Sequence, residues 1–111
     1  MMSIVMNLYY TGQNGAARRF AEEMESSGTA DLIRAEEGNE RYAYFYPAGD
    51  PETVLLIDIW RDQQAIDLHH ASPMMAAIAR LREKYDLHMR AERYVTDASG
   101  IPESDEKFIK K

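Results

Sequence analysis

The side chain best suited to acid–base chemistry in this sequence is His69, near the end of a helix predicted to follow Asp62. Residues three and four apart share a helix face, so His69 lies with the apolar Ala65 and Ile66, whereas His70 is rotated away by about 100°. An inward-pointing imidazole, which titrates near ~6.5, can accept a proton near neutral pH. We predict that His69 is a catalytic base; the alternative is a buried helix-end histidine that bonds a backbone carbonyl.

An acid and an indole lie two residues apart on one face of a predicted strand, Thr53–Trp60, that is largely apolar on both faces. An unpaired buried carboxylate is costly, so Asp58 must be solvated or hydrogen-bonded, and Arg90 or Arg93 could be its structural partner. Trp60, at the end of this strand, fits an ordinary core position. Asp58 is also a candidate substrate-binding residue.

Three further side chains could contact a ligand. Asn7 is an amide in a mostly apolar strand predicted over 3–10, where it bonds either a ligand oxygen or a neighbouring protein group. Tyr44 belongs to a tyrosine face of a strand over 41–46 that suits a pocket or a dimer interface. Met74, at a helix start, either shapes an apolar pocket or fills the core. We predict Asn7 as a second catalytic residue and Tyr44 and Met74 as substrate-binding residues.

The composition is that of one acidic domain. With 111 residues, 45% of them hydrophobic, the chain is long enough to bury a single core. A formal net charge of −6 makes attraction to nucleic acid or an anionic membrane unfavourable, and we expect neither as a partner. Cysteine, a signal peptide and a long apolar run are all missing from the sequence, which predicts a cytoplasmic protein.

The order of the predicted elements is β-α-β-β-α-β, with the last strand over 87–95. Its simplest packing is a ferredoxin-like α+β domain, a four-stranded antiparallel sheet with helices on one face. Because the strand Thr53–Trp60 is apolar on both faces, we predict that the open face packs on a second copy, forming a homodimer of the dimeric α+β barrel type. Residues 1–97 form this domain, and 98–111 form a polar C-terminal tail that could dock on the partner subunit.

The segment 57–73 carries a family resemblance. In it a strand reading Asp58-Ile59-Trp60 leads into a helix in which His69 precedes Pro73 by four residues. This pattern resembles the antibiotic biosynthesis monooxygenase family, which includes small quinol monooxygenases. The family position of Trp60 lines the cavity between sheet and helices, which implies that its indole stacks on a flat substrate.

Other positions qualify the resemblance. The Glu-Glu-Gly-Asn stretch at 36–39 is similar to the phospho-autoinducer-2 isomerase branch, whereas Met74 stands where many members have His and Asp58 where they have Glu. The haem-degrading branch uses Asn, Trp and His at places that correspond to Asn7, His69 and Ala79 here. Only Asn7 matches, so haem degradation is disfavoured.

The resemblance implies a cofactor-independent monooxygenase that oxidises a small aromatic, quinol or phenolic substrate with dioxygen. The sequence has no glycine-rich phosphate loop, metal-ligand spacing or thiol, so we predict no cofactor and no metal, and the substrate must supply the electrons. One alternative is isomerisation of a small keto-sugar phosphate, suggested by residues 36–42. Another is a non-enzymatic dimeric barrel that binds a ligand or responds to stress, because fold does not fix function.

Overall fold

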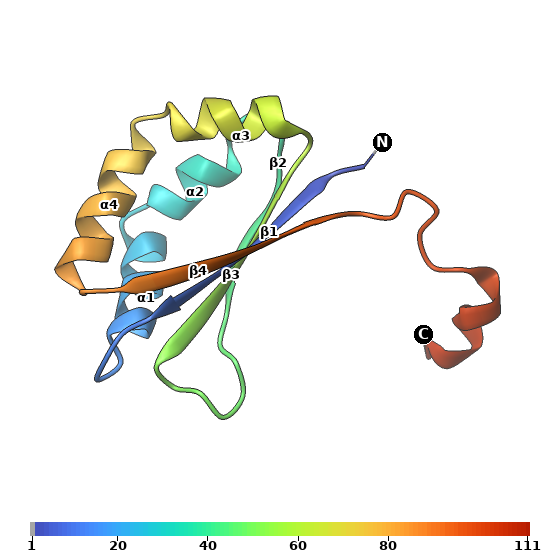
Figure 1. Cartoon of the computed structure of the whole chain (residues 1–111), viewed down its shortest axis with the longest axis horizontal. Coiled ribbons are helices and arrows are strands. Elements are labelled where there is room, and N and C mark those ends of the chain that lie inside the picture. Colours follow the sequence, from blue (N-terminus) through green and yellow to red (C-terminus); the bar gives the residue numbers. More distant parts are fainter. Residues whose placement is uncertain (1) are drawn as a thin grey trace.

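The computed structural model describes residues 2–111 and contains the predicted elements in the predicted order (Figure 1). The second strand begins at Asn39, two residues before the predicted start at 41, because the pairing continues past a bulge between Asn39 and Arg41. The elements are β1 (Ile4–Thr11), α1 (Ala16–Ser26), α2 (Thr29–Arg34), β2 (Asn39–Phe45), β3 (Thr53–Trp60), α3 (Gln63–His70), α4 (Met74–Lys84), β4 (His88–Val95) and a 3₁₀ helix, Glu103–Phe108.

The four strands form one antiparallel sheet in the order β2-β3-β1-β4. This is the ferredoxin-like α+β arrangement that the element order predicted. The sheet is open within one chain, with β2 and β4 as its edges, and it does not close into a barrel. The register sets Met6 of β1 between Asp58 of β3 and Arg93 of β4.

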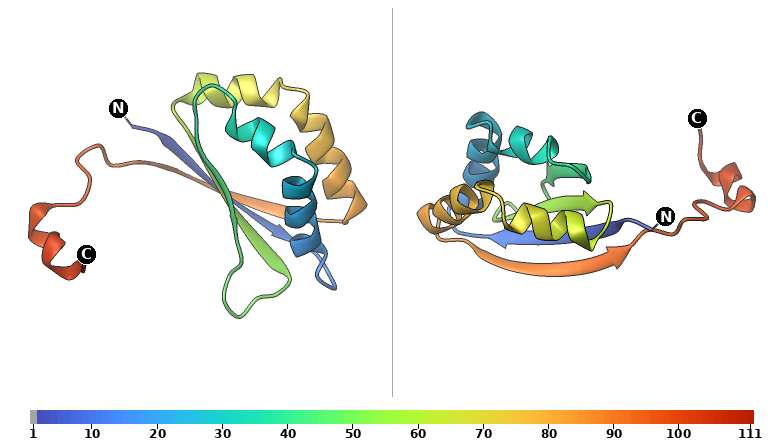
Figure 2. Two further views of the ribbon diagram at one scale, coloured as in Figure 1. Left: turned by 180° about the vertical axis from the view of Figure 1, so that it is seen from behind. Right: turned by 90° about the horizontal axis from the view of Figure 1, so that it is seen from above.

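Alternation along β3 distinguishes the two faces of the sheet. Val54, Leu56, Asp58 and Trp60 are buried under the helices, whereas the residues between them are half-buried on the opposite face. The helices gather on one side of the sheet, so the core lies between these two layers (Figure 2). The largest fully buried side chains are Trp60, Phe20, Met24, Ile33, Leu56 and Val54.

The turn before β2 and the start of α3 hold each other in place. Asp62 is the predicted N-cap of α3, and its carboxylate accepts a hydrogen bond from the Ala65 amide at 2.9 Å. Gly38 adopts φ 86°, and a Cβ there would lie 2.5 Å from the Ala65 Cβ. The Arg61 amide donates to the Gly38 carbonyl at 2.8 Å. Only glycine therefore fits where this turn meets α3.

The start of α4 has no side-chain cap. Ser72-Pro73 has the order of a capping residue followed by proline that is typical of a helix start, but the Ser72 hydroxyl is buried without a hydrogen-bond partner in the described residues. Pro73 occupies the N-cap position in a helical conformation, and backbone carbonyls of Ser72 and Pro73 accept the first bonds. The chain therefore passes from α3 to α4 through a nearly helical connection that leaves the serine side chain no amide to accept from.

The C-terminal residues extend away from the domain (Figure 1). They are exposed and include the 3₁₀ helix Glu103–Phe108, with Ile101, Phe108 and Ile109 as exposed apolar side chains. Within the described residues, none of the helices has the length and apolar character needed to cross a bilayer.

Candidate functional site

A cavity of about 270 Å³ lies between the helix-facing side of the sheet and helices α3 and α4. Most of the side chains that line it are apolar or aromatic, and all four strands contribute to the lining. An apolar and aromatic lining is typical of a site for a small organic molecule. The strand β4 is exposed along this side, so the cavity opens beside that edge. Its polar lining side chains are Asp58, Gln63, His69, His70, Arg82 and Arg93.

His69 is buried against the cavity wall, as the helix periodicity predicted. Its imidazole stacks on the Trp60 indole, with ring centroids 4.7 Å apart and an interplanar angle of 28°. The two strongest sequence candidates thus form one aromatic unit, which fixes the plane of the imidazole. His70 and His88 are exposed, as the rotation of His70 away from Ala65 and Ile66 predicted for the first of them, although His70 also contributes to the cavity lining.

The other side of His69 meets Glu36, whose Oε2 lies 2.7 Å from the imidazole Nδ1. A carboxylate oxygen can only accept, so Nδ1 carries the hydrogen and donates it to Glu36. The hydrogen bond therefore differs from the backbone-carbonyl alternative. Burial lowers the pKa of His69 below its ordinary value, and the Glu36 carboxylate partly offsets that effect. A neutral imidazole with Nε2 as its free acceptor is the result.

Sequence reasoning did not place Glu36 in the site. It lies 33 residues from His69 and belongs to the turn between α2 and β2. The contact follows from strand pairing, which sets Asn39 beside Trp60 and so brings this turn to the end of β3 where α3 begins. No pattern within the sequence reveals that register. The second carboxylate oxygen, Oε1, is buried and has no hydrogen-bond partner among residues 2–111.

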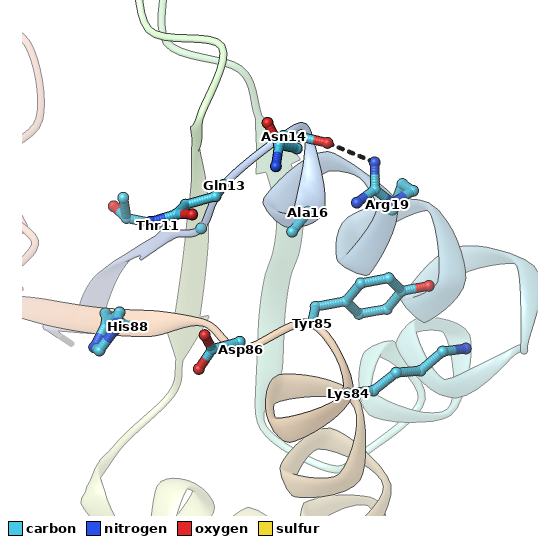
Figure 3. Close-up of a pocket in the computed structure, with 10 residues that line it drawn as sticks. Thr11, Gln13, Asn14, Ala16, Arg19, Lys84, Tyr85, Asp86 and His88 are labelled. Atoms are coloured by element: carbon cyan, nitrogen blue, oxygen red, sulfur yellow. Dashed lines mark hydrogen bonds between the residues drawn. The ribbon is translucent and has the colours of Figure 1, made fainter.

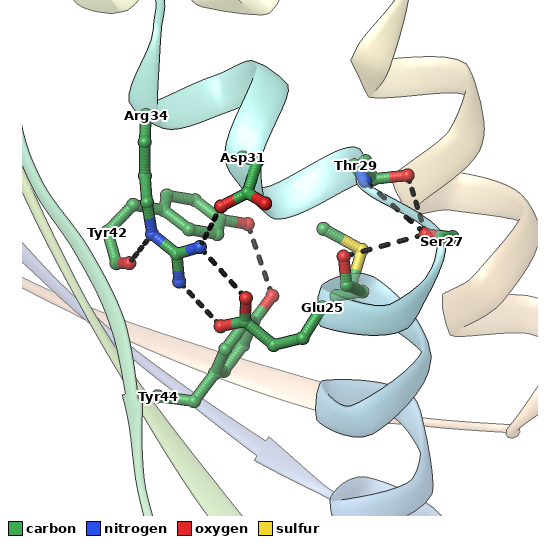
Figure 4. A network of polar contacts seen from close by, with 8 residues as sticks. Glu25, Ser27, Thr29, Asp31, Arg34, Tyr42 and Tyr44 are labelled. Atoms are coloured by element: carbon green, nitrogen blue, oxygen red, sulfur yellow. Dashed lines mark hydrogen bonds and ion pairs between the residues drawn. The ribbon is translucent and has the colours of Figure 1, made fainter.

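A surface network fixes the helix that leads into this turn (Figure 4). Arg34, at the end of α2, donates to the Tyr42 carbonyl at 2.8 Å and to the carboxylates of Glu25 and Asp31. These contacts join α1, α2 and β2, so the backbone just before Glu36 has little freedom. Exposed ion pairs add little stability singly, but a bidentate arginine holds geometry well.

Asp58 lines the cavity next to Trp60 and is 5% exposed. Burial raises the pKa of Asp58 to about 7, against a smaller opposing effect of the Trp60 indole N–H. The proposed pairing with Arg90 or Arg93 is wrong for the described residues. Arg90 lies on the opposite face, 3.8 Å from the Tyr9 ring centroid, and pairs with Glu92. Asp58 Oδ1 is left buried and unpartnered.

Two tyrosines that sequence reasoning did not select, Tyr10 and Tyr42, line the cavity. Burial raises the pKa of Tyr10 to about 12, so both phenols act as neutral hydrogen-bonding groups near neutral pH. The candidate Tyr44 lies outside the cavity lining, behind Tyr42, with the two hydroxyl oxygens 3.2 Å apart. The dimer-interface interpretation of this face is wrong for Tyr42 and Tyr44, because both pack toward the helices.

The remaining two candidates lie outside the cavity lining. Asn7 alternates with the cavity residues Met6 and Leu8, so its amide is on the face away from the helices, where Oδ1 is buried without a partner in the described chain. Met74 is half-buried against the core, and its neighbour Met75 contacts the cavity instead. The structure thus brings together His69, Trp60 and Asp58 and separates them from Asn7.

A second depression lies between the β1–α1 and α4–β4 turns (Figure 3). Its volume is about 380 Å³, but its polar lining is mostly exposed and includes Arg19, Lys84 and His88. Two of its residues, Asn14 and Asp86, have positive φ angles typical of tight turns. Within residues 2–111, no set of three His, Cys, Asp or Glu side chains is arranged to hold a metal ion. The cavity beside His69 is therefore the stronger candidate site.

The fold and this cavity define a class of protein: a small ferredoxin-like α+β domain with an apolar site between its sheet and its helices. The family model described as antibiotic biosynthesis monooxygenase matches residues 2–81. The chain belongs to this family, as the segment 57–73 indicated. No match was found among curated protein sequences.

Solved structures share the fold at low sequence identity. SnoaB from Streptomyces nogalater, described as a cofactor-independent oxygenase, is 16% identical with a TM-score of 0.74, covering 93% of this chain and 100% of SnoaB. PA3566 from Pseudomonas aeruginosa is 20% identical with a TM-score of 0.75, covering 88% and 97% of the two chains. A conserved protein from Methanosarcina mazei Go1 is 20% identical with a TM-score of 0.73, covering 85% and 92%.

Proposed function

We propose that this protein is a cofactor-independent monooxygenase that oxidises a small quinol or phenolic compound with dioxygen. The observation that carries the proposal is the Glu36–His69–Trp60 unit at the wall of an apolar cavity. Membership of the antibiotic biosynthesis monooxygenase family and the likeness in fold to SnoaB support the same reaction class.

The chemistry begins with removal of a proton from the substrate hydroxyl. His69 Nε2 accepts this proton, and the carboxylate of Glu36 stabilises the resulting imidazolium through the Nδ1 hydrogen bond. A phenol titrates near ~10 and an imidazole near ~6.5, so the transfer is uphill by about 5 kcal/mol unless the site stabilises both charges. The ion pair with Glu36 supplies part of that stabilisation on the protein side.

The electron-rich phenolate then reduces dioxygen directly. For a quinol, one oxygen atom replaces a ring hydrogen and the other leaves as water, so a quinol and dioxygen become a hydroxylated quinone and water. All four electrons come from the substrate, and the two protons that it loses end on the oxygen atom that leaves as water, with His69 returning the proton that it accepted. The apolar lining of the cavity excludes water from the reactive intermediate.

Oxygen-electrode assays with a panel of hydroquinones and naphthoquinols test the proposal. We expect uptake above buffer autoxidation with at least one member, and a fall of about 10²- to 10⁴-fold in His69→Gln, the range for loss of a general base. His88→Gln is the matched control because His88 is exposed and outside the cavity. Uptake no faster than autoxidation across the panel would reject the oxygenase assignment.

Isomerisation of a small keto-sugar phosphate is the second candidate, favoured by the Glu36–His69 pair, which could move a proton between two carbon atoms. This reaction consumes no oxygen. Incorporation of solvent deuterium into such a ligand under argon, dependent on His69, would favour it over the oxygenase. Absence of exchange in every ligand tested would count against it.

We also propose that the protein is a homodimer in which the open faces of two sheets meet. This face carries the half-buried apolar side chains Val5, Tyr9, Leu55, Ile57 and Ile59, and none of the described elements covers it. A contiguous apolar face of this kind marks an interface. A second copy is the simplest cover, because a twofold axis brings the same face to itself.

A further inference from the structure

Two arginines line the cavity, Arg82 from α4 and Arg93 from β4. Neither forms an ion pair with any side chain among residues 2–111. The same holds for four arginines outside the cavity, so what distinguishes these two is their place in its lining: the others are Arg18, Arg19, Arg41 and Arg80. Arg82 is half-buried, with its guanidinium carbon 5.9 Å from the centroid of the Tyr10 ring at the cavity wall. Arg93 extends from the exposed edge strand where the cavity opens.

The charge balance of the cavity is opposite to that of the whole chain. The chain carries a formal net charge of −6, yet the cavity lining holds two permanently charged guanidinium groups and a single carboxyl group, Asp58. Burial raises the pKa of Asp58 to about 7, so its carboxyl group is mostly neutral below that pH. An acidic protein therefore keeps a cationic rim around an apolar cavity, which is the arrangement that selects an amphiphilic anion.

We propose that the substrate carries an oxyanion group, a carboxylate or a phosphate monoester, which Arg82 and Arg93 bind at the β4 side of the cavity while its apolar ring lies against Trp60. Guanidinium groups match such groups through paired N–H donors. This inference names the class of substrate that binds in the cavity of the proposed oxygenase. It rests on the proposed function for the reaction, whereas the binding of an anion is independent of it.

Isothermal titration calorimetry with redox-stable probes tests the inference without turnover. The carboxylate probe is 4-hydroxybenzoate, the phosphate probe is phenyl phosphate, and the neutral probe is 4-hydroxybenzamide. We expect at least one anion to bind about tenfold or more tightly than the amide, the usual gain from hydrogen bonds to a charged group. Whichever of the two anionic probes binds more tightly identifies the oxyanion group of the substrate. Equal or tighter binding of the amide overturns the inference.

Variants assign the preference to the two arginines. Arg82→Gln and Arg93→Gln should each lower anion affinity several-fold and leave amide affinity nearly unchanged. Arg80→Gln is the matched control and should leave the preference intact, because Arg80 lies on the same helix, α4, but is exposed and outside the cavity lining. If Arg82→Gln fails to fold, Arg82→Lys keeps the charge but loses the paired donors and should still weaken anion binding. An unchanged preference in the variants of both cavity arginines overturns the assignment.

The two proposals fail separately. An anion preference that depends on Arg82 and Arg93, found in a protein that consumes no oxygen, supports this inference and rejects the oxygenase. Oxygen uptake with neutral quinols, found together with no anion preference, supports the oxygenase and rejects this inference.

Discussion

At the scale of single residues, two carboxylate oxygens at the site accept no hydrogen bond from the described residues. Glu36 Oε1 and Asp58 Oδ1 are buried and unpartnered within the described chain, although buried polar atoms in proteins nearly always have a partner. Both lie beside residues of the cavity wall, Glu36 next to His69 and Asp58 next to Trp60. Asp58 lines the cavity, where a donor group of a bound molecule would satisfy it, whereas Glu36 lies outside the lining, on the other side of His69.

Asp58 should make the stability of the protein depend on pH. Its folded pKa of about 7 lies above the ordinary 3.8, so between these values the folded state holds a proton that the unfolded state has lost. The free energy of unfolding therefore falls as the pH rises from about 4 to above 7, by up to about 4 kcal/mol for this group. Asp58→Asn should remove that dependence. Urea unfolding at pH 5 and pH 8 measures it.

The control for this prediction is Asp67→Asn, because Asp67 is exposed on α3. It should follow the wild-type pH dependence. If the stability difference between wild type and Asp58→Asn is the same at both pH values, Asp58 does not titrate in the folded protein as its burial implies.

Glu36 should act as a positioning residue for His69. Glu36→Gln keeps the shape but removes the charge that stabilises an imidazolium, so the pKa of His69 should fall further and kcat should drop about 10- to 100-fold. The imidazole C–H resonances followed by NMR across pH give the first readout, and oxygen uptake gives the second. Glu37→Gln, on an exposed side chain paired with Arg61, is the control. An unaltered His69 titration would contradict the role of Glu36.

At the scale of elements, the turn at Gly38 fixes the distance between Glu36 and α3. Gly38→Ala should destabilise the protein more than Gly49→Ala, although both glycines have similar positive φ angles of 86° and 81°. The reason is that a Cβ at Gly38 meets Ala65, whereas one at Gly49 meets nothing within 4 Å. We expect about 1–2 kcal/mol for Gly49→Ala and a further ~1–3 kcal/mol for Gly38→Ala. Thermal or urea unfolding compares them, and equal losses would show that the turn can move away from α3.

At the scale of the whole molecule, the uncovered face of the sheet should set the oligomeric state. Light scattering should give twice the chain mass of 12.8 kDa. Ile57→Lys places a charge at the centre of that face, on β3, and should yield the monomer at micromolar concentration. Leu32→Lys, on an exposed apolar residue of α2 at 59% exposure, should remain dimeric. A wild-type protein that scatters as a monomer would refute the dimer.

The tail belongs to the same scale. Its apolar side chains Phe108, Ile101 and Ile109 are exposed, and the tail extends away from the rest of the chain. We retain the hypothesis that residues 98–111 pack on the second copy.

Local patterns in the sequence were enough for the element order, the ferredoxin-like sheet and the inward position of His69. These features depend on periodicities of two and 3.6 residues and on a cap such as Asp62, all of which act between residues close in the chain. They also placed Asp58 and Trp60 together, because both lie on one face of β3.

Only the tertiary structure decided what meets His69 and which side of each strand forms the cavity. The sequence separates Met6 from Asn7 by alternation, but it cannot say which face the helices cover, so Asn7 was included in the site. Glu36 reaches His69 through the α2–β2 turn, and Arg82 reaches the cavity from α4, both by packing between distant segments. Such contacts depend on how layers dock, and no periodicity within one segment encodes them.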